Sequence, residues 1–148
     1  MEAIRIGLLG VGTVGAGVFQ VLARNGGEIE RRSGRRLQVT QVARRDTAAA
    51  KAVVGDAAGI SSDPWRVVND PNIDVVVELM GGYTLAKDLV LKAIANGKHV
   101  VTANKALLAV HGGEIFEAAR RQGVVVAFEA AVAGGIPIIK TLREGMSA

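Results

Sequence analysis

A glycine-rich turn near the start of the chain restricts the folds that this sequence can adopt. The segment Gly10-Val11-Gly12-Thr13-Val14-Gly15 follows an apolar run, Ile4–Leu9, and precedes residues with helical periodicity. A G-x-G-x-x-G sequence between a strand and a helix is typical of dinucleotide-binding βαβ units. The turn therefore predicts a parallel sheet that includes this strand, with a ligand site at the strand's carboxyl end.

The residues of this turn have separate expected roles. Gly10 permits the tight turn, Gly12 has no side chain to obstruct a pyrophosphate, and Gly15 lets the helix and strand pack closely. Thr13 and Val14 open the helix, whose free N–H groups and partial positive charge favour phosphates. We expect all five residues to contribute to cofactor binding. The alternative is a tight turn without a ligand.

The rest of the sequence alternates apolar runs with helical patterns. Strands are expected at Ile4–Leu9, Leu37–Ala43, Ile73–Leu79, Lys98–Thr102 and Val124–Phe128. Helices are expected after the glycine turn and at Ala48–Val54, Trp65–Asn69, Leu85–Ala95 (capped by Thr84), Asn104–Val110 and Gly113–Gln122. This alternation predicts an α/β fold with a doubly wound parallel sheet, a Rossmann-type dinucleotide-binding domain.

The first helix is expected to bury one apolar face. That face is formed by Val14, Val18, Val21 and Leu22, which are spaced at i, i+4, i+7 and i+8. The helix ends either at Asn25-Gly26-Gly27 or, in a longer alternative, near Arg32.

Composition excludes several classes of protein. The 148 residues, 49% of them hydrophobic, suffice for one domain with a core and argue against disorder. No apolar run approaches the ~20 residues of a membrane span. The start of the sequence does not resemble a signal peptide, and the absence of cysteine excludes disulfides and thiolate metal sites. We expect a cytoplasmic protein that does not contact a membrane.

Much of the net charge of +4 comes from one arginine-rich stretch. Its members are Arg24, Arg31, Arg32, Arg35, Arg36, Arg44 and Arg45. A basic cluster is compatible with nucleic-acid binding, but the few aromatic side chains argue against a surface that stacks on bases. We therefore expect no nucleic-acid partner. We expect solvated arginines, of which one or two are recruited for a phosphate.

The end of the second expected strand bears on the choice of cofactor. NAD-binding domains commonly place an acidic residue there to hold the ribose hydroxyls, whereas this strand ends in Val42-Ala43-Arg44-Arg45-Asp46. A guanidinium can bind a 2′-phosphate and stack on adenine, and Asp46 comes slightly late for the ribose role. We favour NADP, with NAD as a second possible cofactor. The alternative for Arg44 and Arg45 is exposed loop charge.

Four segments carry a resemblance to a known family. They are Gly7–Gly15, Val77-Glu78-Leu79-Met80-Gly81-Gly82, Val101-Thr102-Ala103-Asn104-Lys105 and the stretch Glu129–Ile139, which contains Glu-x-x-Val-x-Gly-Gly-Ile-Pro. In order and separation they resemble the amino-terminal part of homoserine dehydrogenase over essentially the whole chain. The resemblance implies an oxidoreductase that interconverts aspartate 4-semialdehyde and homoserine with NAD(P)H, in threonine and methionine biosynthesis. It also implies a small-molecule substrate and a homo-oligomeric full-length enzyme.

The resemblance also assigns individual residues. Lys105 matches a family lysine near the nicotinamide and the substrate, so it is the catalytic candidate, since a lysine can supply a proton or stabilise a negative oxygen. Gly81 and Gly82 are expected to let the backbone pass close to the cofactor. The family further implies a sodium ion, and its expected ligands are Glu129 and the main chain of Val132, Gly134 and Ile136. The alternative for Glu129 is a carboxylate that caps the Gly134-Gly135 turn.

The last residues begin a new helical pattern that lacks a partner domain. Ile136, Ile139, Leu142 and Met146 share one face of it. We therefore expect a dinucleotide-binding domain at 1–133 and, at 134–148, the first segment of a catalytic and dimerisation domain, truncated before the substrate domain. The alternatives are a nucleotide-sensing regulatory module with the same fold, and the cofactor domain of another amino-acid dehydrogenase.

Overall fold

Six parallel strands form one sheet at the centre of the molecule, in the order β3-β2-β1-β4-β5-β6. The structure is a computed structural model that describes residues 3–134 and 136–145. The strands are β1 (Ile4–Leu9), β2 (Leu37–Ala43), β3 (Gly59–Ser61), β4 (Val75–Glu78), β5 (His99–Thr102) and β6 (Val126–Ala127). This arrangement confirms the predicted doubly wound α/β fold.

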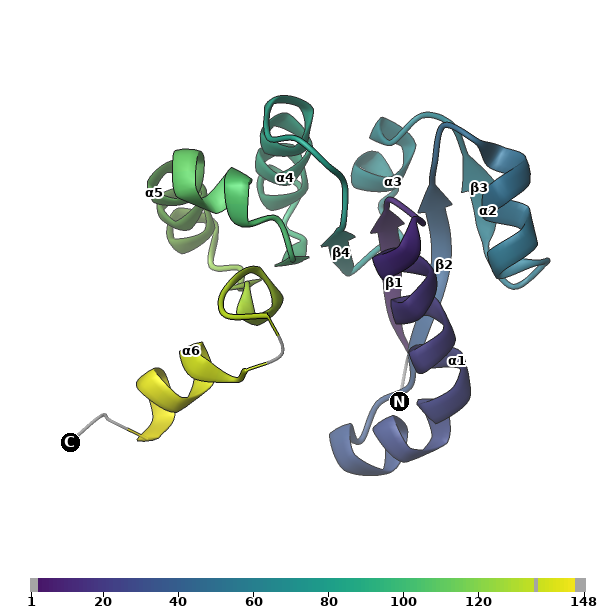
Figure 1. Ribbon diagram of the computed structural model, residues 1–148, viewed down its shortest axis with the longest axis horizontal. Coiled ribbons are helices and arrows are strands. Elements are labelled where there is room, and N and C mark those ends of the chain that lie inside the picture. The colour runs from purple at the N-terminus through teal and green to yellow at the C-terminus, as the bar shows by residue number, and fades with distance from the viewer. Residues whose placement is uncertain (1–2, 135, 146–148) are drawn as a thin grey trace.

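Helices cover both faces of the sheet (Figure 1). On one face, α1 (Thr13–Ser33) and α2 (Thr47–Val54) pack on apolar side chains of β1 and β2. On the other face lie α3 (Trp65–Asn69), α4 (Thr84–Ala95) and α5 (Lys105–Gln122). Alternate residues of a strand therefore enter different cores: Val76 joins the second set of helices and Val77 the first.

The order of the strands creates a switch point between β1 and β4. From β1 the chain runs outward through β2 to β3, and it then returns to the centre and runs outward again from β4 to β6. Loops at the carboxyl ends of β1 and β4 thus turn away from each other, which leaves a crevice where ligands of such sheets bind. The three-residue strand β3 lies outside the predicted strands because it is too short to show a periodicity.

Helix α1 follows the longer of its two predicted alternatives, and its predicted buried face is partly wrong. Val18 and Leu22 pack against the core, but Val14 is 58% and Val21 52% exposed. The reason is the contact at Gly15, where a Cβ would lie 2.1 Å from the carbonyl oxygen of Gly10. This close approach turns Gly15 toward the sheet, and Val14 and Val21 consequently point away from it.

Two expectations in the second half of the chain were also wrong. The segments predicted as two helices, 104–110 and 113–122, form the single helix α5, which continues through a buried Gly112. Packing of α5 on α4 outweighs the low helix propensity of the glycines. Thr84 is the first residue of α4 and does not cap it: the N-cap is Tyr83, without a side-chain hydrogen bond.

After β6 the chain leaves the sheet. A 3₁₀ turn (Glu129–Ala131) leads to α6 (Ile138–Lys140) and a π-helical turn (Thr141–Gly145), which project from the rest of the molecule (yellow in Figure 1). The predicted helical pattern is present there, although Met146 lies outside the described residues. The predicted boundary between residues 133 and 134 stays a prediction. No helix in the described part of the chain is both long and apolar enough to cross a membrane.

Candidate functional site

A cavity of about 740 Å³ opens at the carboxyl edge of the sheet, above the switch point. Residues from the ends of β1, β2, β3 and β4 line it together with Leu85 of α4. The lining residues are Gly10, Val11, Gly12, Ala43, Arg44, Arg45, Ser62, Pro64, Leu79, Met80, Gly81 and Leu85. The cavity therefore combines apolar walls with a glycine turn and two guanidinium groups.

The glycine turn has the geometry that its sequence predicts. Gly10 has a φ of +97°, and a Cβ there would lie 2.8 Å from the carbonyl oxygen of Leu79, so only glycine fits. Gly12, the N-cap of α1, is exposed, and a Cβ there would meet no atom within 4 Å. The space above Gly12 is thus open at the helix N-terminus, where N–H groups attract phosphate.

The two arginines after β2 differ in their surroundings. Arg44 is half-buried, and its guanidinium donates a hydrogen bond to the carbonyl oxygen of Val11 in the glycine turn. Arg45 is exposed and also lines the cavity. Asp46 is engaged elsewhere, since it is the N-cap of α2 and its carboxylate accepts a hydrogen bond of 2.9 Å from the N–H of Ala49.

On the other side of the cavity, the loop after β4 is tied to the start of α5. Asn104 is the N-cap of α5, and its Oδ1 accepts a hydrogen bond of 3.0 Å from the N–H of Leu107. Its Nδ2 donates to the carbonyl oxygen of Gly82 at 2.6 Å. Lys105, the first residue of α5, is exposed, and no other residue in the described ranges forms a hydrogen bond or ion pair with its side chain.

The cavity gathers only part of the predicted cofactor set. Gly10, Gly12, Arg44, Arg45 and Gly81 line it. Thr13, Val14, Gly15, Gly82 and Lys105 lie in the adjoining turns and helix starts and are not among the lining residues. Sequence reasoning missed Ser62 and Pro64, because β3, the strand that precedes them, was not predicted.

Glu78 was not among the predicted site residues, although it lies at the edge of the sheet that carries the cavity. It ends β4 at the carboxyl edge, and its side chain is completely buried. The hydroxyl of Thr102 donates to its Oε2 at 2.6 Å, and the N–H of Met80 donates to its Oε1 at 2.8 Å. Burial raises the pKa of Glu78 above its ordinary value, and hydrogen bonds from Thr102, Met80 and Asn104 partly oppose that increase.

Glu129 accepts hydrogen bonds from the beginning of α6. Its Oε1 accepts from the N–H of Ile139 at 2.9 Å and its Oε2 from the N–H of Lys140 at 3.0 Å. The carboxylate thus binds two N–H groups at the start of α6 in this structure. Within the described ranges, no group of three or more His, Asp or Glu side chains is arranged to hold a metal ion.

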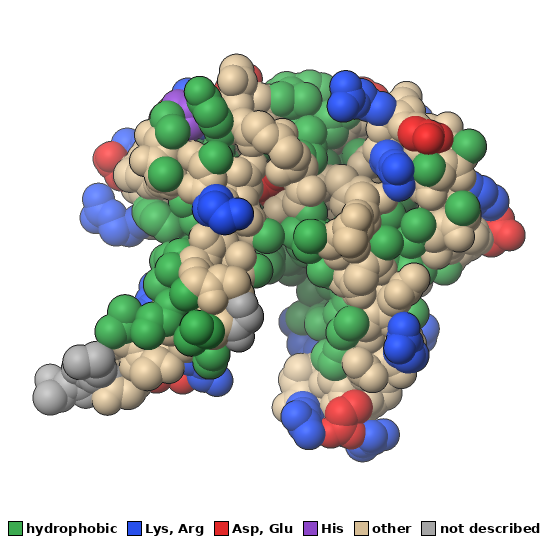
Figure 2. All heavy atoms as spheres, viewed as in Figure 1, with side chains coloured by type: hydrophobic (Ala, Val, Ile, Leu, Met, Phe, Trp, Pro, Cys, Tyr) green, Lys and Arg blue, Asp and Glu red, His purple; other side chains and the backbone are tan. Residues whose placement is uncertain are grey.

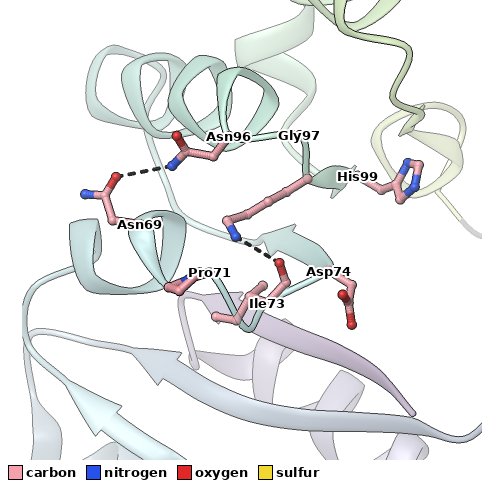
Figure 3. Close-up of a pocket in the computed structure, with 8 residues that line it drawn as sticks. Asn69, Pro71, Ile73, Asp74, Asn96, Gly97 and His99 are labelled. Atoms are coloured by element: carbon pink, nitrogen blue, oxygen red, sulfur yellow. Dashed lines mark hydrogen bonds between the residues drawn. The ribbon is translucent and has the colours of Figure 1, made fainter. Parts of the chain in front are cut away.

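A second cavity, of about 570 Å³, lies at the opposite, amino edge of the sheet. Figure 3 shows Asn69 and Asn96 joined at one side of it, where Asn96 Nδ2 donates to Asn69 Oδ1 at 3.3 Å, and Ile73 and Asp74 farther along its lining. This cavity has no helix N-terminus of the glycine-turn kind and lies away from the switch point. The carboxyl-edge cavity is therefore the candidate site.

Comparison with known proteins agrees with this geometry. The family model described as "Homoserine dehydrogenase, NAD binding domain" matches residues 10–129, a segment that begins in the glycine turn and ends at Glu129. The chain belongs to this family. The resemblance inferred from the four sequence segments is thereby confirmed, and the homoserine dehydrogenase domain is one that binds a nicotinamide dinucleotide.

Individual relatives extend the match across the chain. A homoserine dehydrogenase from Pseudomonas aeruginosa is 62% identical over 148 residues, and one from Bacillus subtilis is 40% identical over 147. The crystal structure of a homoserine dehydrogenase from Thiobacillus denitrificans superposes with a TM-score of 0.94 at 57% identity, covering 99% of this chain and 34% of that one. The chain spans about a third of the length of these relatives (34% of each named relative).

Proposed function

We propose that this chain supplies the cofactor-binding part of an NAD(P)H-dependent enzyme that interconverts aspartate 4-semialdehyde and homoserine. The observation that carries the proposal is the carboxyl-edge cavity: a glycine turn, two arginines and a second glycine loop meet above the switch point of a homoserine dehydrogenase domain. A family match of this extent does not favour a nucleotide-sensing module or another amino-acid dehydrogenase.

The two sides of the cavity divide the cofactor between them. A dinucleotide in this fold lies across the switch point, with its adenosine half over β2 and β3 on one side of β1. Arg44, Arg45 and Ser62 belong to that side, the pyrophosphate lies over Gly12, and the nicotinamide half extends toward β4 and β5. The exposed guanidinium of Arg45 is free to bind a 2′-phosphate, which supports NADP over NAD.

Lys105 is the residue of this chain that would handle a proton. A bound nicotinamide supplies or takes up hydride at the carbon of the aldehyde or alcohol group. In the reducing direction Lys105 gives a proton to the oxygen of the aldehyde, and in the reverse direction its neutral amine takes the proton from the hydroxyl group. Its exposed position beside Asn104, which contacts Gly82, supports this role.

The donor set around Glu129 fits a sodium ion in its chemistry. Each carboxylate oxygen accepts one N–H bond from α6 and keeps a second lone pair, and oxygen ligands suit hard cations. Glu129 and the carbonyl groups of Val132, Gly134 and Ile136 would hold the ion. A homo-oligomeric full-length enzyme and a cytoplasmic location also form part of the proposal, and both rest on the family resemblance.

A chimera tests the proposed activity. This chain replaces the matching third of the Pseudomonas aeruginosa relative, and NADPH oxidation is followed with aspartate 4-semialdehyde. We expect turnover in the chimera, whereas the 148-residue chain alone is expected to bind cofactor without turnover. Lys105→Ala in the chimera should lower kcat by about 10²–10⁴-fold, and Lys92→Ala, on an exposed part of α4, should not.

Two results would contradict the proposal. An inactive chimera with an intact fold argues against the activity, and a loss of only a few fold in Lys105→Ala argues against proton transfer by this residue.

A further inference from the structure

A polar cluster with a fully buried carboxylate connects the ends of two central strands. Glu78 ends β4 and Thr102 ends β5, and the two residues are paired across the sheet. Both side chains are 0% exposed, and the Thr102 hydroxyl donates to Glu78 at 2.6 Å. No cation among the described residues forms an ion pair with Glu78, so neutral donors alone stabilise its charge.

The cluster extends to the start of α5 through a relay of hydrogen bonds. The backbone N–H of Asn104 donates to the Thr102 Oγ1 at 3.0 Å, and the Thr102 hydroxyl donates in turn to Glu78. The side chain of Asn104 contacts the loop after β4, where its Nδ2 donates a hydrogen bond of 2.6 Å to the carbonyl oxygen of Gly82. Thr102 therefore sets the position of the residue that joins the loop to the helix.

Glu78 and Thr102 are polar residues at buried positions of an otherwise apolar part of the sheet. The neighbouring positions Val76 and Val77 fill the same strand with apolar side chains, and burying an unpaired carboxylate is unfavourable unless its oxygens are hydrogen-bonded. The donors that satisfy Glu78 come from Met80, Thr102 and Asn104, and of these Met80 lines the cavity. The cluster thus ties a buried strand end to a loop that carries two adjacent glycines.

We infer that Glu78 and Thr102 are positioning residues that hold the Met80–Gly82 loop and the Asn104-Lys105 helix start in place for the nicotinamide half of the cofactor. This inference rests on the proposed binding of NAD(P) at the carboxyl edge. It predicts that the cluster acts on one half of the ligand. The adenosine half, over Arg44 and Arg45 on the far side of β1, should be insensitive to it.

Two substitutions of Thr102 separate the hydrogen bond from the side-chain volume. Thr102→Val keeps the shape and removes the hydroxyl, whereas Thr102→Ser keeps the hydroxyl. Dissociation constants are measured for NADPH and for 2′-phospho-ADP-ribose, which has the adenosine half and the pyrophosphate but no nicotinamide. Thr102→Val should weaken NADPH by about tenfold, the affinity equivalent of one lost charge-assisted hydrogen bond, and should leave the fragment unchanged within about twofold. Thr102→Ser should bind both ligands as the parent does.

A control variant and a substitute variant complete the experiment. Thr40→Val, at a half-buried position of β2 away from the cluster, is the matched control and should change neither ligand. Glu78→Gln, which preserves shape and removes one acceptor, replaces Thr102→Val if that variant does not fold, with the same expected selectivity. Equal losses for NADPH and the fragment, or no loss for either, would overturn the inference. A parent chain that binds neither NADPH nor NADH would instead overturn the proposed function, and the inference with it.

Discussion

Glu78 and Lys98 are buried ionisable side chains at opposite edges of the same sheet, and different hydrogen-bond partners stabilise them. Glu78 ends β4 at the carboxyl edge, and Lys98 immediately precedes β5 at the amino edge. The side chain of Glu78 is 0% exposed, and Lys98 is 4% exposed. Neither has a close ion-pair partner among the described residues, so both charges depend on hydrogen bonds with neutral groups, which Glu78 accepts and Lys98 donates.

The hydrogen-bond partners of Lys98 and Glu78 indicate different roles for the two edges of the sheet. The Lys98 ammonium donates to the carbonyl oxygens of Asp70 (2.6 Å) and Ile73 (2.8 Å), and it thereby closes the turn between α3 and β4. Beside it, Arg5 and Asp74 pair across β1 and β4, so Asp74 is less solvated than its position at a strand start suggests. Glu78 instead orients an open loop beside the ligand cavity. A buried charge at the amino edge stabilises the fold, and one at the carboxyl edge positions a site.

The largest expected effect is on stability at the amino edge. Lys98→Met retains the length of the side chain but leaves two carbonyl oxygens without their donor, which should lower the free energy of unfolding by about 2–4 kcal/mol. NADPH affinity should not change, because the crevice lies at the other edge. Denaturant unfolding and NADPH titration measure both quantities, with the exposed Lys92→Met as control. A folded Lys98→Met chain with weakened NADPH binding would contradict the claim that the amino edge affects stability without affecting cofactor affinity.

The next effect is on affinity at the carboxyl edge. Gly12→Val places a branched side chain in the open space above the N-terminus of α1, where the pyrophosphate is expected. NADPH should bind more than about a hundredfold less tightly, or ~2.7 kcal/mol, while the thermal unfolding midpoint stays close to that of the parent. The matched variant Gly15→Val should fail to fold, since its Cβ would lie 2.1 Å from a backbone oxygen. Undiminished NADPH binding by Gly12→Val would disprove the phosphate assignment.

A smaller effect separates the two arginines. Arg45→Ala should weaken NADPH by about tenfold, because a charge-assisted hydrogen bond to the 2′-phosphate is lost, and should leave NADH almost unchanged. Arg44→Ala should weaken both cofactors, since Arg44 also holds the glycine turn through the carbonyl of Val11. Calorimetric titration with each cofactor distinguishes the two patterns. Equal losses of NADPH and NADH in Arg45→Ala would exclude a 2′-phosphate role.

The smallest effect is a dependence of stability on pH. The pKa of Glu78 is raised in the folded chain, so the folded state keeps a proton that the unfolded state has already released. Stability should therefore fall as pH rises from the ordinary glutamate pKa of 4.5 toward the folded value, by at most about 1.4 kcal/mol per pH unit. Glu78→Gln should lack this slope, as determined from denaturant unfolding at several pH values. An identical slope in the variant would assign it to other groups.

For Lys98 the sign is opposite. Burial lowers its pKa, so stability should rise with pH between the folded value and the ordinary lysine pKa of 10.5. Lys98→Met should abolish this rise.

The sequence predicted the central elements better than the rim of the sheet and the site. The bounds of β1 and β2 match the apolar runs Ile4–Leu9 and Leu37–Ala43, because a strand covered on both faces is continuously apolar. Strand β3 and the rotation of α1 were not predictable in this way, since a three-residue strand has no period and the rotation depends on one contact of Gly15. The role of Glu78 also depends on pairing between distant strands, which no local pattern encodes.

The surface explains why composition alone did not identify a partner. In the view of Figure 2, Lys and Arg side chains are spread around the outline of the molecule, with acidic side chains among them, and do not form one patch. Arg31 and Arg32 of the arginine-rich stretch both pair with Glu28 at the far end of α1. Only Arg44 and Arg45 of that stretch reach the cavity, because β2 ends beside the glycine turn.

Mapping of amide chemical shifts during an NADPH titration would locate the cofactor site, since it reports on both edges of the sheet in one experiment. We expect saturable changes concentrated at residues 10–13, 43–46 and 79–82, where the cavity lies, with residues 70–74 and 96–99 at the amino edge unaffected. Changes centred on the amino edge, or no saturable change at millimolar NADPH and NADH, would contradict the assignment of the carboxyl edge as the cofactor site.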